Sequence, residues 1–156
     1  MKIGERVRDM IRHWLQIQPA TGQNITIRET ASFDVNCMYI GAQGDVGNSA
    51  IAKGCTVLGE VKNSVLSTGT CVDEGAEVSY SVVMPGAVIG KGAKVSYAII
   101  GEGCRIGENA VVGGAPGSVD FDHWGIAVVG PHAQVRGGQV IQPNMMLGED
   151  GKEVRR

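Results

Sequence analysis

This 156-residue sequence has few aromatic residues (4%) and few charged residues (19%), and basic residues (14) do not outnumber acidic ones (16). Because nucleic-acid-binding surfaces need a basic excess on one face, the charge balance argues against a nucleic-acid partner. No apolar run approaches the length of a membrane span, and no signal peptide opens the sequence. We therefore expect no membrane association and a cytoplasmic location.

Metal-ligating and redox motifs are also missing. The four cysteines form no C-x-x-C pair, which removes the usual zinc and redox signatures. A zinc site shared by adjacent repeats needs three histidines around one metal, whereas His13 lies in a different predicted element from His123 and His132. We predict no metal, no cofactor and no catalytic residue.

The sequence does contain an internal repeat of seventeen residues. The segments NSVLSTGTCVDEGAEV, YSVVMPGAVIGKGAKV and YAIIGEGCRIGENAVV stack without gaps. Aliphatic residues recur at steps of six, six and five, at Leu66, Val72, Val78, Val83, Ile89, Val95, Ile100, Ile106 and Val112. A short fixed period of this kind predicts a solenoid.

Each step of the repeat has an inner and a corner position. The residue two positions before each aliphatic is small. Because alternate residues of a strand face the same side, one large and one small side chain should point inward in each step. Three before the aliphatic, the six-residue steps carry glycine or Asn109, which suit a corner with positive φ. This pattern predicts triangular coils, with Cys55 and Cys104 inside and Cys71 outside.

The rhythm continues on both sides of the central repeats. It begins at Ile40, shortens to a four-residue step between Val57 and Val61, and resumes from Val129 to Leu147 after the segment GGAPGSVDFDHWG. We predict a β-helix over residues 39–148, followed by a polar tail over 149–156.

Residues 1–38 follow a different pattern. Apolar residues at helical spacing, with basic residues on the other side, predict an amphipathic helix that ends before Pro19, followed by a short strand. The stretches RVRDMIRHWLQIQPA and TIRETASFD resemble the N-terminus of phage portal proteins. A cap over the end of the solenoid, a helix for a partner or a second copy, and a loose tail all remain open.

From about Tyr39 to Leu147 the sequence resembles the C-terminal β-helix domain of glucose-1-phosphate adenylyltransferase. The stretches GCTVLGEVKNSVLSTGTCVDEGAEVSYSVVMPGAVIGKGAKVSYAIIGEGCRIGENAVVGG and WGIAVVGPHAQVRGGQVI carry this resemblance. It implies an all-β, left-handed parallel β-helix, a hand that periodicity alone does not reveal because β-crossovers are usually right-handed. It also implies a role in ADP-glucose synthesis for glycogen, with β-helix domains that associate subunits and shape effector response.

In that family the chemistry belongs to an N-terminal nucleotide-binding domain. No glycine-rich loop between a strand and a helix occurs in this sequence. We therefore expect a non-catalytic regulatory and oligomerisation domain without the nucleotidyltransferase part, and leave open whether the chain takes part in an enzyme. Its expected partners are a second copy or a catalytic adenylyltransferase subunit.

Family effectors are anions, so outward cations are the candidate effector-binding residues. The resemblance matches Arg105 to an arginine common in the family, and Lys94 is a second outward cation, although outward charges on a solenoid are ordinary. The positions that match effector lysines of plant members are Ser96 and Pro131, and neither is basic.

Two alternatives remain. Hexapeptide acyltransferases use a histidine as general base, and the segment after Val112 contains Asp120, Asp122 and His123. The same segment follows the adenylyltransferase pattern, which favours a structural loop with Trp124 packed back on the coil. The other alternative is an assembly module without activity.

Overall fold

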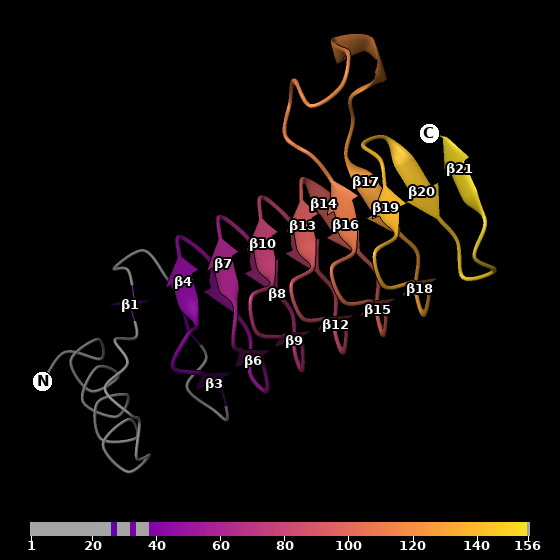
Figure 1. Cartoon of the computed structure of the whole chain (residues 1–156). Helices are drawn as coiled ribbons and strands as arrows, with labels where there is room; N and C mark the ends of the chain where they lie inside the picture. The colour runs from indigo at the N-terminus through magenta and orange to yellow at the C-terminus, as the bar shows by residue number, and fades with distance from the viewer. Residues whose placement is uncertain (1–25, 28–31, 34–37, 156) are drawn as a thin grey trace, which may run out of the picture.

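The structure is a computed structural model that describes residues 26–27, 32–33 and 38–155. The described chain winds into about six three-sided coils stacked along one axis (Figure 1). This confirms the all-β, left-handed parallel β-helix. The amphipathic helix expected over residues 1–18 and most of the portal-like segment lie outside the described residues.

Three sheets form the sides of the prism, and each complete coil contributes one strand to each sheet. Sheet A contains β1 (Thr26–Ile27), β4 (Asp45–Gly47), β7 (Glu60–Lys62), β10 (Glu77–Ser79), β13 (Lys94–Ser96), β16 (Val111–Gly113) and β19 (Val140–Ile141). Sheet B contains β2 (Ser32–Phe33), β5 (Ala50–Ile51), β8 (Val65–Leu66), β11 (Val82–Val83), β14 (Ala98–Ile100), β17 (Ala127–Val129), β20 (Met145–Leu147) and β21 (Glu153–Arg155). Sheet C contains β3 (Tyr39–Ile40), β6 (Thr56–Val57), β9 (Cys71–Val72), β12 (Val88–Ile89), β15 (Arg105–Ile106) and β18 (Gln134–Val135).

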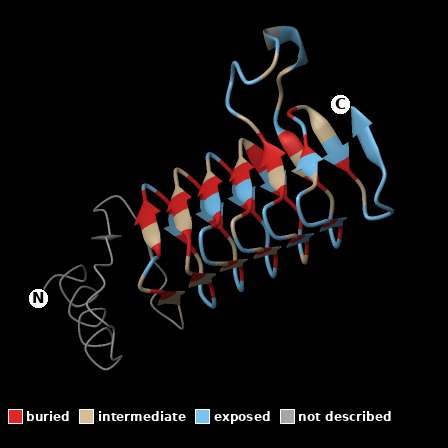
Figure 2. Ribbon diagram, in the orientation of Figure 1, coloured by how far each residue is buried: buried red, intermediate tan, exposed pale blue. Residues whose placement is uncertain are grey.

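The predicted inner positions are the core of the structure. All nine aliphatics of the central repeats and the small residues two positions before them are buried, and Figure 2 shows buried red positions next to tan or pale blue ones along the strands. Cys55 and Cys104 lie inside, as the pattern predicts. The strand register places equivalent residues of successive coils next to one another, so Val83 lies between Leu66 and Ile100.

The corner between sheets A and B is tighter than the other two. A single residue with positive φ turns the chain there, at Asn48, Asn63, Tyr80 and Tyr97 (φ 46° to 50°). The sequence pattern predicted positive φ only at the corners of the six-residue steps, so the left-handed tyrosines of this five-residue step were not foreseen. A bulky residue with this backbone conformation is strained, and interactions between coils offset the strain: Asn48 donates to Asn63 over 2.7 Å, and the Tyr80 and Tyr97 rings stack at 4.8 Å.

Buried serines complete this corner. The Ser64 hydroxyl donates to the Lys62 carbonyl over 2.7 Å and accepts the Ser81 N–H over 3.1 Å. Ser81 repeats the arrangement with the Ser79 carbonyl and the Ala98 N–H. Because buried backbone groups need partners, these hydroxyls satisfy the groups that the tight turn leaves free, and their role is structural.

One loop leaves the prism between β16 and β17, shown in orange-brown in Figure 1. It contains the 3-10 turn η1 (Phe121–His123). At the far end of the chain, β21 pairs antiparallel with β20 and extends sheet B, so part of the predicted polar tail is a hairpin strand. None of the described helical segments is long and apolar enough to cross a membrane.

Candidate functional site

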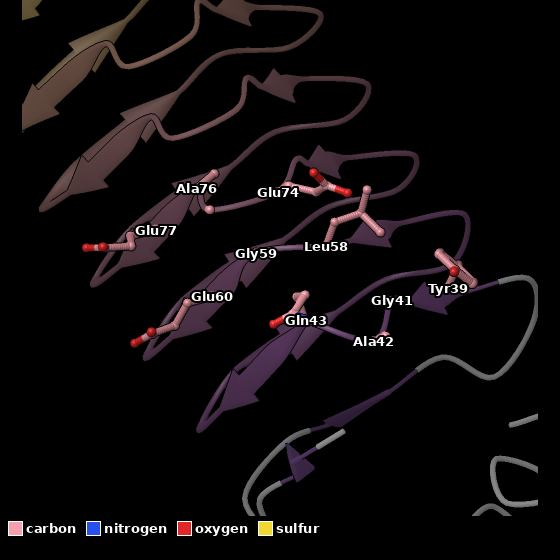
Figure 3. A pocket seen from close by; sticks show the side chains of 11 residues that line it. Tyr39, Gly41, Ala42, Gln43, Leu58, Gly59, Glu60, Glu74, Ala76 and Glu77 are labelled. Carbon is pink, nitrogen blue, oxygen red and sulfur yellow. The ribbon is translucent and has the colours of Figure 1, made fainter. Parts of the chain in front are cut away.

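A groove crosses the first three coils at the edge between sheets C and A (Figure 3). Its volume is about 680 Å³. It is lined by Tyr39, Gly41, Ala42, Gln43, Leu58, Gly59, Glu60, Glu74, Gly75, Ala76 and Glu77. This groove is a concave surface formed by described residues, and a ligand could enter it from solvent.

The groove arises from the four-residue step between Val57 and Val61. The coils before and after it turn through two extra residues at this edge, at 42–43 and 74–75, and the middle coil does not. Leu58 and Gly59 therefore form the floor of the groove, and the two longer neighbouring turns form its walls. A Cβ on Gly59 would overlap the Ala76 carbonyl oxygen, so glycine is required for this close approach.

The three glutamates of the lining are each paired with a lysine. Lys91 lies 3.3 Å from Glu74 and Lys94 lies 3.5 Å from Glu77, while Lys62 contacts Glu60. Such exposed pairs contribute little to stability. The lining offers carboxylates, an amide and a phenol, but no histidine, cysteine or serine. It offers groups that can pair with charges and exchange hydrogen bonds with a ligand.

Lys62 also links the groove to Asp45. Its ammonium nitrogen lies 3.7 Å from Asp45 Oδ2, while the other carboxylate oxygen, Oδ1, is buried and has no hydrogen-bond partner among the residues that the structure describes. The carboxylate is thus half satisfied, which is unfavourable for a buried oxygen. Among the described residues, no group of three or more His, Cys, Asp or Glu side chains is arranged to hold a metal ion.

The two candidate effector residues lie on different sides of the prism. Lys94 belongs to β13 in sheet A, and Arg105 belongs to β15 in sheet C. Both side chains point outward, as expected, and Lys94 is paired with Glu77. The structure does not bring them together, so the two residues cannot hold a single small anion within one coil.

His123 and His132 are also separated. His123 is exposed in η1 on the projecting loop, whereas His132 forms a corner between sheets B and C with φ 56°. The His132 ring lies over Gly103, where any Cβ would be 2.6 Å from Nδ1. His132 thus occupies a corner position that is glycine in the preceding coil, and its ring packs on that coil. We therefore assign His132 a structural role.

The loop is tied to the prism by Trp124. Its indole N–H donates to the Gly114 carbonyl over 2.8 Å, and its ring meets the edge of Tyr97 at 5.8 Å. The tryptophan therefore packs back on the coil, as the sequence indicated.

The described cysteines are poor nucleophiles. Burial raises the pKa of the Cys55, Cys71 and Cys104 thiols, because desolvation penalises the thiolate. The Cys104 thiol also donates to the Gly130 carbonyl over 2.8 Å. These residues act as small core or surface side chains.

Residues 37–128, more than half of the chain, match the family model described as GlmU-like, C-terminal hexapeptide. This chain belongs to that family. Within this GlmU-like hexapeptide family, the matched span covers the groove, both candidate effector residues and the projecting loop.

Curated relatives of this GlmU-like hexapeptide chain include glucose-1-phosphate adenylyltransferases. That of Acetivibrio thermocellus is 52% identical over 40 residues, which is 26% of this chain and 9% of the relative. That of Clostridioides difficile is 55% identical over 40 residues, 26% of this chain and 10% of the relative. The match thus spans about a tenth of each relative's length.

Solved structures similar to this GlmU-like chain include two described as acetyltransferases. The acetyltransferase domain of PglB from Neisseria gonorrhoeae, in complex with acetyl coenzyme A, is 20% identical with a TM-score of 0.41, over 95% of this chain and 66% of that one. A putative acetyltransferase from Bacillus cereus is 16% identical with a TM-score of 0.34, over 81% of each chain.

Sequence reasoning located the shortened step of this hexapeptide domain but did not foresee the groove that it leaves. The signal was present, since a coil two residues shorter than its neighbours must leave a gap at one corner. The stacking of Tyr80 on Tyr97 was also missed, although both occupy the position of Asn63 in the repeat.

Proposed function

We propose that this chain is a non-catalytic assembly and regulatory β-helix that acts with a glucose-1-phosphate adenylyltransferase in the synthesis of ADP-glucose. One observation carries the proposal: identity above 50% over 40 residues with two such enzymes. The interior is filled by small and aliphatic side chains, so the prism contributes its outer surfaces to function.

The charged surfaces support the regulatory part of this proposal. Lys94 and Arg105 lie on separate sheets, so an anionic effector would meet one of them together with groups from a neighbouring chain. Arg105 has no acidic neighbour across its own sheet, where Val88 and Gln134 flank it. Arg105 is therefore the better of the two candidates for an anion such as a sugar phosphate.

The test mixes the purified full chain with the purified adenylyltransferase of Clostridioides difficile and measures complex formation by sedimentation velocity. We expect a complex at micromolar concentrations and a shift in how the rate of ADP-glucose formation depends on the concentration of fructose 1,6-bisphosphate, used as the probe anion. The variant Arg105→Ala should still bind but should weaken the shift, and Lys91→Ala serves as a matched surface control.

Two results would overturn the proposal. One is the absence of any complex or any shift at concentrations of tens of micromolar. The other is release of pyrophosphate from ATP and glucose 1-phosphate by this chain alone, which would show a catalytic role.

A further inference from the structure

The groove at the edge between sheets C and A has one polar side and one apolar side. Figure 3 shows Glu60 and Glu77 along one side, and Leu58 and Tyr39 along the other. A Cβ on Gly41 would lie 2.5 Å from Leu58 Cδ2 and 3.6 Å from Tyr39 Cε1, so these two side chains lie together over the glycine. Both are partly exposed. A ligand in the groove therefore meets an apolar surface and hydrogen-bonding groups at the same time.

The polar side keeps hydrogen-bonding capacity although its charges are paired. Each lysine contacts one oxygen of its glutamate, namely Oε1 of Glu60, Oε2 of Glu74 and Oε1 of Glu77. A carboxylate has about four acceptor positions, so each of the three glutamates can still accept hydrogen bonds from a ligand. The amide of Gln43, which is exposed in the first turn, adds donors and a further acceptor.

The same ion pairs select against a charged ligand. The three carboxylates of the lining repel a phosphate or carboxylate group. A cation would compete for these carboxylates with lysines that the chain itself already holds beside them. An uncharged ligand that exchanges hydrogen bonds meets neither penalty.

Among uncharged ligands, a pyranose sugar has the same two-sided character as the groove. Its C–H groups form apolar faces that pack on aromatic and aliphatic side chains, and its ring hydroxyls donate and accept hydrogen bonds. The volume of about 680 Å³ lies within the range of roughly 300–1,000 Å³ typical of small-ligand pockets. Because the groove crosses three coils, a short linear chain of sugars fits it better than a single ring.

We propose that this groove binds an uncharged oligosaccharide of about two or three pyranose units. The sugar faces pack on Leu58 and Tyr39, and the hydroxyls donate to the three glutamates of the lining. The proposal goes beyond the proposed function and does not depend on it. Because each hydrogen bond to the sugar replaces one to water, the dissociation constant is about 0.1–3 mM.

The test is isothermal titration calorimetry of the full chain with maltotriose and with cellotriose, which are both uncharged trisaccharides. We expect at least one of them to bind, and Glu74→Ala to weaken that binding at least fivefold. Glu108→Ala is the matched control, because Glu108 is an exposed glutamate of the same corner column, two coils further on and outside the groove. Both variants change exposed side chains and should fold like the wild type.

Methyl NMR spectra of the wild type locate the bound sugar without any substitution. The Leu58 signals should move as the sugar is added, while those of Val140, in β19 at the far end of the prism, should stay fixed. Glucose 1-phosphate and spermidine serve as charged probes in the same titrations, and we expect neither to move the Leu58 signals at the concentration where the sugar does.

Three results would overturn the proposal. The first is the absence of heat and of any Leu58 shift with either trisaccharide at about 10 mM. The second is equal weakening by Glu74→Ala and Glu108→Ala, which would put the sugar outside the groove. The third is tighter binding of a charged probe beside Leu58. Sugar binding by a chain that forms no complex with an adenylyltransferase would uphold this proposal while the proposed function fails.

Discussion

Sheets A and B differ only on the outside. From β4 and β5 onward both have buried aliphatic inner rows, for example Val78 in sheet A and Val83 in sheet B. Outside, sheet A carries ion-paired carboxylates and lysines, whereas strands β5, β8, β11, β14, β17 and β20 of sheet B carry only apolar side chains. Since the backbone and period are the same, the inner row specifies the fold, and the outer row is free to specify what the surface contacts.

The largest effect is expected where the two sheets are alike. Val78→Asp and Val83→Asp each place an unpaired carboxylate in a fully buried position, at a cost of several kcal/mol. We expect both variants to lose the cooperative thermal transition seen by circular dichroism. Val82→Asp, one residue along on the outer side, should melt close to the wild type.

Equal stability of Val82→Asp and Val83→Asp would contradict the inward and outward assignment. A variant at Val78 that folds normally while Val83→Asp does not would show that sheet A contributes less to the core than sheet B.

A smaller loss is expected where the loop interrupts the edge between the two sheets. Gly113 has φ 75°, and a Cβ there would overlap the Ser96 carbonyl oxygen, so Gly113→Ala should cost about 3 kcal/mol from the overlap and the strained backbone. Gly69→Ala is the matched control, with φ 71° but no atom within 4 Å of the added Cβ, and should cost only about 1 kcal/mol. Urea denaturation measures both, and equal losses would show that φ alone accounts for the effect.

The tyrosine stack at the same edge should contribute less still. Tyr97→Ala removes the stack with Tyr80 and the edge contact with Trp124, which together contribute about 1–2 kcal/mol. The tryptophan fluorescence maximum should also move to longer wavelength as Trp124 loses its cover. Tyr80→Ala removes only the stack, so it should lower stability less and leave the fluorescence maximum unchanged.

The smallest effect is expected on the charged side of sheet A. Lys94→Ala breaks an exposed pair with Glu77 and should change the free energy of unfolding by no more than ~0.5 kcal/mol. Thermal melts at low and high salt measure it. A loss above about 1 kcal/mol would mean that the sheet A charges help to specify the fold.

The buried inner residues could be predicted from the sequence because the same residue types recur at the same position of every repeat. Val83, Ile89 and their small partners Ser81 and Ala87 are all buried, as the spacing predicted. Features that depend on comparison between coils were harder to foresee. The groove beside Leu58 exists only because its two neighbouring turns are longer, and pattern matching within one coil does not show this.

Site prediction was weaker for a related reason. Lys94 and Arg105 were chosen one by one as outward cations, although the predicted triangular coil already puts the steps of Val95 and Ile106 on different sides of the prism. The apolar row of sheet B also spans residues seventeen or more apart, such as Val65, Val82 and Ile99. No local window of sequence contains it.

The separation between inner and outer rows is tested most directly by the melting temperatures of Val83→Asp and Val82→Glu/Ile99→Glu beside that of the wild type. Val83 is fully buried, so Val83→Asp should lose the cooperative transition. Val82 and Ile99 are exposed, so Val82→Glu/Ile99→Glu should melt within a few degrees of the wild type. A double variant that melts far below the wild type would contradict the account, because the outer row of sheet B would then also maintain the fold.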